Sequence, residues 1–216
     1  MLRVCAALIP HHGIGRSAGS LKTNHFNGKK SSKRVARKES CFYHWRVSHP
    51  TFIKKHPVQK QLHAIANLIQ GGDRSLRASD PEISGWSVDQ HVDHMLKVTR
   101  AILNFIEKGK ELDEPGVTAL GRMVLFVGRI PRGRAVSPDA VVGVSCSIET
   151  LTANLVEIRE TSKRVLPNAE LLKSKKLVFR HPRFRAMTAK QSLRFCEIHN
   201  RHHLEIIEEI HARTRG

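Results

Sequence analysis

The sequence is poor in the residues that stabilise small disulfide-rich proteins or span membranes. Its 216 residues include only four cysteines and no C-x-x-C pair, which excludes a dense disulfide framework and a zinc site made of cysteines alone. No run approaches the ~18 apolar residues of a membrane-spanning helix, so we expect no membrane association and a cytoplasmic location. Alternation of apolar and polar residues is short everywhere, which disfavours a β-rich fold.

Acidic residues are nearly absent from the N-terminal part of the chain. Residues 1–60 hold 13 of the 37 Lys and Arg residues but a single acid, Glu39, so most of the net charge of +18 belongs there. Residues 1–57 show no apolar periodicity, which predicts a disordered basic extension before a single domain over residues 58–213. The extension could be a dispensable tail, a targeting peptide or an arm that binds nucleic acid.

Four segments of the domain have the apolar spacing of amphipathic helices. The second and fourth open with the S/T-x-x-Q pattern of a capping box, Ser87 to Gln90 and Thr188 to Gln191. The four predicted helices cover residues 58–70, 87–108, 148–165 and 188–210. Four helices of this length predict an all-α fold, a four-helix bundle.

The connection between the second and third helices is long. Residues 109–147 exceed a short hairpin turn, so this segment is expected to cross over the bundle, with a further short helix within residues 117–130. The following Pro131-Arg132-Gly133-Arg134 predicts irregular chain.

Two histidines of the last helix are predicted to face the interior. At ~100° per residue, His199 and His203 fall inside the apolar stripe, one turn apart, while His202 falls at its edge. Two imidazoles at this spacing can bind one metal ion, and the alternative is a pair of hydrogen-bonded core histidines. Asn200 stands where the H-E-x-x-H motif has its general base, which excludes that motif.

A metal site needs a third ligand, and the second helix offers His91 and His94. The centre of its apolar face lies nearer to His91, so periodicity slightly favours that residue but does not decide between the two. Asp93, between them, points away from His94 and is interpreted as a solvated helix charge. Cys196, on the interior stripe of the last helix, is interpreted as a small buried apolar residue rather than a ligand.

The order of these motifs resembles a known family. Gly85-Trp86-Ser87 opens a helix, a histidine follows eight residues after the Trp, and H-x-x-x-H lies in the last helix. This arrangement resembles the DinB-like metalloproteins, which include YfiT-like hydrolases and bacterial transferases of low-molecular-weight thiols. The segment His181-Pro182-Arg183-Phe184, continuing to His202-His203-Leu204, resembles a subfamily with an H-P-x-F…L-T…H-x-x-H-H-L ending.

The resemblance covers roughly residues 58–212 and implies an up-down-down-up bundle with a three-histidine metal site. Its ligands would be His94, His199 and His203, and the metal would be zinc, nickel or iron. Ser192 departs from the group, whose members often have an aromatic residue there, lining the pocket.

Three neutral imidazoles favour a transition metal over Mg²⁺ or Ca²⁺. The expected function is that of a metal-dependent enzyme, a hydrolase that activates water or a transferase that activates a low-molecular-weight thiol. The alternatives are a non-catalytic binding module stabilised by the metal, and a nucleic-acid-associated protein that uses the basic arm. The sequence leaves a homodimer open.

Overall fold

The computed structural model describes residues 56–133 and 137–214 of the chain. The extension predicted over residues 1–57 lies outside the described residues except for its last two. His56 caps the first helix with its side chain, and Pro57 is the first residue of that helix.

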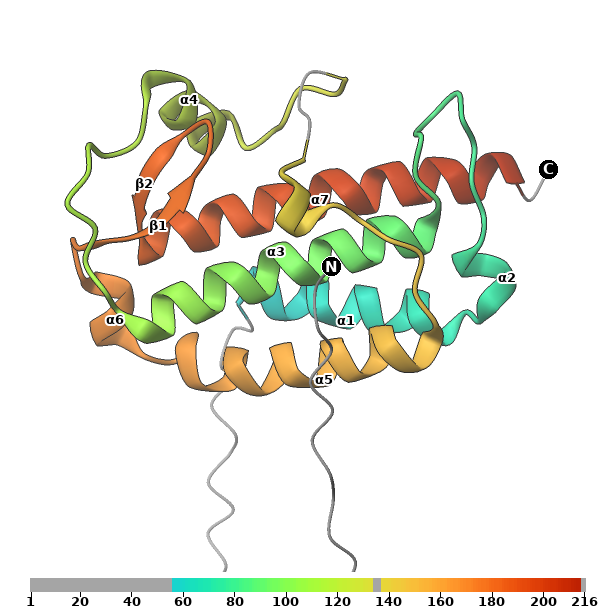
Figure 1. Ribbon diagram of the computed structural model, residues 1–216, viewed down its shortest axis with the longest axis horizontal. Helices are drawn as coiled ribbons and strands as arrows, with labels where there is room; N and C mark the ends of the chain where they lie inside the picture. The colour runs from blue at the N-terminus through green and yellow to red at the C-terminus, as the bar shows by residue number, and fades with distance from the viewer. Residues whose placement is uncertain (1–55, 134–136, 215–216) are drawn as a thin grey trace, which may run out of the picture. The chain divides into compact units, whose positions relative to one another are not determined.

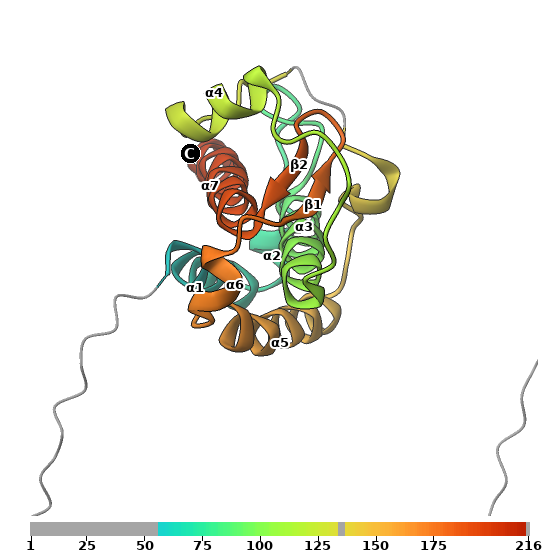
Figure 2. The same cartoon turned by 90° about the vertical axis from the view of Figure 1, so that its left-hand side faces the viewer.

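Four long helices form the bundle that the sequence predicts. They are α1 (Pro57–Gln70), α3 (Val88–Lys108), α5 (Ile148–Val165) and α7 (Ala189–Thr214). Helices α1 and α3 each pack against both α5 and α7, as the end-on view in Figure 2 shows. Helices α1 and α7 run in one direction and α3 and α5 in the other (Figure 1). The all-α, up-down-down-up arrangement is therefore confirmed.

Capping and apolar periodicity both contribute to these helices. The Thr188 N–H donates to Gln191 Oε1 at 3.0 Å and the Gln191 N–H donates to Thr188 Oγ1 at 3.3 Å, which completes the predicted capping box before α7. At the start of α3, the Ser87 N–H donates to Gln90 Oε1 at 2.9 Å. The apolar stripes then bury residues such as Ile65 and Ile102 completely, and this burial stabilises the bundle.

The long connection between α3 and α5 crosses the bundle. It contains α4 (Ala119–Val127), inside the range predicted for a short helix, and the single-turn helix η1 (Asp139–Val141). From the last residue of η1 onward, residues 141–146 lie along the first turns of α3 and make several hydrogen bonds with it. We call residues 137–146 the strap. Two further short helices are α2 (Asp73–Leu76) and α6 (Ala169–Lys173).

A small antiparallel hairpin was not predicted. Its strands β1 (Leu177–His181) and β2 (Arg185–Thr188) lead directly into α7 and contact both α3 and α7, beside the seam between these helices (Figure 2). The strands are short and β1 buries two consecutive residues, Val178 and Phe179, so no period-2 pattern marks them. Within the described ranges, no helix has both the length and the hydropathy needed to cross a bilayer.

Candidate metal centre

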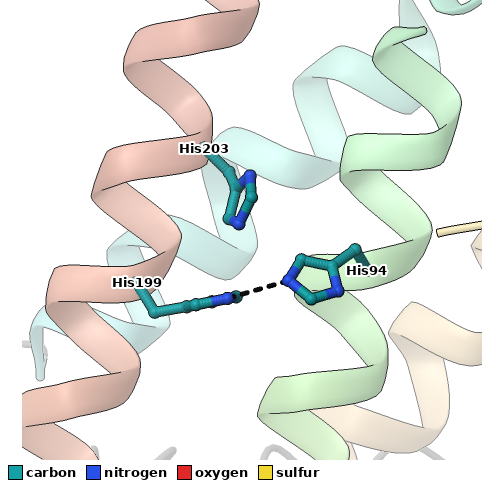
Figure 3. A group of neighbouring side chains, drawn as sticks. All are labelled: His94, His199 and His203. Carbon is teal, nitrogen blue, oxygen red and sulfur yellow. Dashed lines mark hydrogen bonds between the residues drawn. The ribbon is translucent and has the colours of Figure 1, made fainter. Parts of the chain in front are cut away.

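Three imidazoles from two helices converge in the interior of the bundle. His94 comes from α3, and His199 and His203 come from successive turns of α7. One ring nitrogen of each lies within 4.8 Å of a ring nitrogen of the other two, and Figure 3 shows the three rings turned toward one another. The nearest pair, His94 Nε2 and His199 Nε2, is 2.9 Å apart. We call these residues the histidine triad.

The triad is nearly inaccessible to solvent. His94, His199 and His203 are only 4%, 7% and 8% exposed. Their ring centroids lie 4.6 to 4.8 Å from one another. Trp86, from the G-W-S segment before α3, makes a T-shaped contact with His94 at 5.1 Å and stacks on His203 at 6.3 Å. The indole therefore covers one side of the triad and restricts the approach of water.

Burial keeps the triad neutral near pH 7. It lowers the pKa of His199 and His203 well below the ordinary imidazole value, and the neighbouring imidazoles lower both further. Burial also lowers the pKa of His94, although the Val141 carbonyl and the Asp93 carboxylate oppose that shift. A neutral imidazole keeps a lone pair on one ring nitrogen, so no proton has to leave before a metal ion binds.

The rear nitrogens of two triad members have acceptors nearby. His94 Nδ1–H donates to the Val141 carbonyl of the strap at 2.5 Å. His199 Nδ1 lies 3.5 Å from Asn200 Oδ1, and the Asn200 amide donates to Thr99 Oγ1 at 3.1 Å. Such contacts fix the orientation and tautomer of a ligating imidazole, because the proton stays on Nδ1 and the lone pair on Nε2.

His91, which periodicity slightly favoured as third ligand, lies behind His203 rather than in the triad. Its Nδ1 is 3.0 Å from His203 Nδ1, and its Nε2 is 2.9 Å from Ser84 Oγ. Among the described residues, the group of three that could hold an ion contains His94 instead. The geometry thus favours His94, which the family resemblance implies, over His91, which the apolar periodicity of the helix slightly favoured.

The interpretation of Asp93 as a solvated charge is wrong. Its side chain is buried, accepts the Val144 N–H of the strap at 3.0 Å and pairs with Lys97 at 2.7 Å. Asp89, one turn earlier, is also buried and binds Ser145 Oγ at 2.6 Å and the Cys146 N–H at 3.2 Å. Sequence periodicity missed this role because the strap that covers these carboxylates comes from a distant part of the chain.

Cys196 behaves as the small buried residue that was predicted. Its side chain is fully buried, with Sγ 3.5 Å from Thr99 Oγ1, and burial raises the pKa of the thiol to about 11. A neutral thiol is a poor metal ligand and a poor nucleophile. Ser192 is also buried and donates its hydroxyl to the Thr188 carbonyl at 2.8 Å, so it completes the first turn of α7.

The H-P-x-F segment forms the turn of the hairpin and joins it to the triad. His181 Nδ1 accepts the N–H groups of Arg183 and Phe184, both at 3.2 Å. Its ring stacks on Phe184 and meets the edge of Phe195 at 4.7 Å. Phe195 in turn lies 5.7 Å from the His199 ring. The motif identified in the sequence therefore forms one wall of aromatic rings beside the triad.

Comparison with known families agrees with this architecture. A family model described as the DinB superfamily matches residues 58–207, which is more than half of the chain and includes all three residues of the triad. The chain belongs to the DinB superfamily. Comparisons with curated proteins and with solved structures gave no significant match.

Proposed function

We propose that His94, His199 and His203 bind one divalent transition-metal ion. The observation that carries this proposal is the 2.9 Å contact between His94 Nε2 and His199 Nε2. With its Nδ1 proton donated to Val141, neutral His94 directs a lone pair at His199, and two facing lone pairs repel unless a cation or a proton lies between them. The distance is close to the ~3.3 Å between two nitrogens held ~2.0–2.1 Å from one tetrahedral zinc ion.

The donor set indicates the class of metal. Three neutral nitrogens suit zinc, nickel or iron, whereas Mg²⁺ and Ca²⁺ prefer oxygen ligands. Both carboxylates buried on α3, Asp89 and Asp93, hold the strap instead. The charge of a divalent ion would therefore not be neutralised by the triad, which favours an anionic fourth ligand from solution.

We further propose that the site belongs to an enzyme that activates water or a low-molecular-weight thiol. The metal would supply a Lewis acid that lowers the pKa of either nucleophile toward neutrality. The chain itself orients the triad through Val141 and Asn200 and limits access with Trp86. The described triad contains no carboxylate that could act as a general base and deprotonate water. A thiol loses its proton more easily than water, so it is the better substrate.

The depth of the triad supports one alternative function. Side chains that are 4% to 8% exposed leave little room for a substrate, as is typical of a structural metal site. In that case the metal would stabilise a non-catalytic binding module. The two functions differ in whether the ion keeps an exchangeable position.

Elemental analysis and turnover assays test these functions together. The protein, purified without chelator and offered Zn²⁺, Ni²⁺ and Fe²⁺, should retain about one ion per chain. The loaded protein is then incubated with low-molecular-weight thiols plus an electrophile, and separately with amide and ester substrates. Turnover should require the metal and disappear in His203→Ala, but persist in the matched control His202→Ala, whose ring lies outside the triad.

Absence of any bound ion would contradict the metal site itself. A bound ion without turnover, and without a position that small ligands such as azide or cyanide can occupy, would instead favour the binding module.

A further inference from the structure

On one side of the triad, the side chains of Ser84, His91 and His203 form a hydrogen-bonded series. Ser84 Oγ lies 2.9 Å from His91 Nε2, and His91 Nδ1 lies 3.0 Å from His203 Nδ1. Ser84 Oγ also accepts the backbone N–H of Trp86 at 3.2 Å, which fixes the loop before α3. His91 is 2% exposed, so its ring nitrogens have these partners rather than bulk water.

The donor-to-acceptor direction of these hydrogen bonds depends on which ring nitrogen of His203 carries the proton. Figure 3 shows one ring nitrogen of His203 turned toward the other triad members. Since Nδ1 contacts His91, the nitrogen that faces them is Nε2. A ligand needs a lone pair at that atom, so neutral His203 must hold its proton on Nδ1 and donate it to His91. His91 Nδ1 then accepts, and its Nε2–H donates to Ser84 Oγ.

We propose that His91 is a positioning residue that sets the tautomer and ring orientation of His203 for metal binding. The inference rests on the proposed metal site and adds to it the third rear contact. Val141 accepts from His94, Asn200 lies beside His199, and His91 accepts from His203. A chain of neutral imidazoles adds no charge to the interior, whereas a carboxylate in this place would add a negative charge.

Two other roles for His91 agree less well with the structure. As a fourth ligand it would have to join the triad, but its nitrogens already face Ser84 and His203, and it is not part of the described group. As a mere space-filling residue it would need no acceptor, and an apolar side chain would avoid the cost of burying a polar ring. The two matched contacts at 2.9 and 3.0 Å instead indicate a selected hydrogen-bond geometry.

Substitutions that keep or remove the acceptor test the proposal. In His91→Asn, Oδ1 takes the place of Nδ1 along the side chain and can still accept from His203, whereas His91→Leu has similar bulk and no acceptor. His202→Leu is the matched control, because it removes an imidazole whose ring is 5.2 Å from that of His203 without removing a contact to His203 Nδ1. The full-length chain carries each substitution.

The measurements are the Zn²⁺ dissociation constant, obtained by competition with a chromophoric chelator, and the visible spectrum of the protein saturated with Co²⁺. Loss of an outer contact of this kind weakens metal binding roughly 10- to 100-fold. We expect that loss in His91→Leu, recovery to within a few fold of wild type in His91→Asn, and no change in His202→Leu. The Co²⁺ bands should keep their positions in His91→Asn, since the same three nitrogens bind.

Three outcomes would overturn the proposal. Wild-type affinity in a folded His91→Leu would show that the acceptor is not needed. Equal losses in His91→Leu and His91→Asn, with Co²⁺ bands that shift, would identify His91 as a direct ligand. A lower melting temperature of both metal-free variants with unchanged affinity would make the role purely structural. If the wild-type protein binds no metal at all, the proposed function fails first, which distinguishes the two failures.

Discussion

The two helices that carry the buried histidines use them in different ways. On α7, His199 and His203 are four residues apart, which places them ~40° apart around the helix, and both belong to the triad. On α3, His91 and His94 are three residues apart, ~60° around the helix in the opposite sense, and they diverge. His94 faces His199, whereas His91 contacts Ser84 and the rear of His203.

This difference shows that burial alone does not place a histidine in the triad. All four histidines are less than 9% exposed, and burial lowers the pKa of each. The buried polar residues of α3 also include Asp89 and Asp93, whose carboxylates bind the strap. Helix α3 therefore places one buried imidazole in the triad, uses another to contact Ser84 and His203, and directs two carboxylates at the strap, whereas both buried imidazoles of α7 belong to the triad.

The largest expected effect comes from the α7 pair. Because both rings belong to the triad, replacing His199 and His203 together by Ala removes two of three nitrogens and should reduce the metal content from about one ion per chain to none. Elemental analysis after gel filtration measures the metal content, and helicity by circular dichroism is the control for folding. Retention of a stoichiometric ion by the folded double variant would mean that the site lies elsewhere.

The α3 pair gives a graded effect that tests the comparison directly. His94→Ala removes a triad nitrogen and should weaken metal binding far more than His91→Ala, which removes only a contact to His203. Isothermal titration calorimetry of both metal-free variants with Zn²⁺ measures the ratio of their dissociation constants. A larger loss of affinity in His91→Ala than in His94→Ala would show that apolar periodicity was a better guide to the third ligand than the family resemblance.

Acid should destabilise the metal-free protein through both helices. Burial lowers the pKa of His91 from 6.5 to about 4, and that of His199 and His203 well below 6.5. The unfolded chain therefore binds more protons than the folded one below pH ~6.5, so stability is complete above this pH and falls toward pH 4. With a chelator present, the urea midpoint of unfolding should be lower at pH 5.0 than at pH 7.5. Equal midpoints at the two pH values would contradict the burial of these histidines in the neutral form.

The smallest effect is expected outside both helices. A chain that begins at Phe52 lacks most of the basic residues of the predicted extension but keeps α1 and the rest of the bundle. Since residues 1–51 show no apolar periodicity, the melting temperature and metal content should stay within experimental error. A large decrease in melting temperature would show that the extension packs on the bundle.

The sequence by itself determined the four long helices and the position of the α7 pair, but not the short helices α2 and α6. Apolar periodicity and the capping boxes at Ser87 and Thr188 located α3 and α7, because these signals depend on residues within one or two turns. The length of residues 109–147 predicted the crossover. His199 and His203 could be assigned to the interior since both lie near the centre of one apolar stripe.

Only the tertiary structure placed His94 rather than His91 beside His199 and His203, showed that Asp93 is buried, and revealed the hairpin. Periodicity gives angles around a single helix, but not the rotation of that helix relative to its neighbours, which packing across the whole bundle determines. Asp93 is buried by a strap some fifty residues away along the chain, with Val144 as its partner. Such contacts leave no local signal, because the groups that satisfy them come together only when the chain folds.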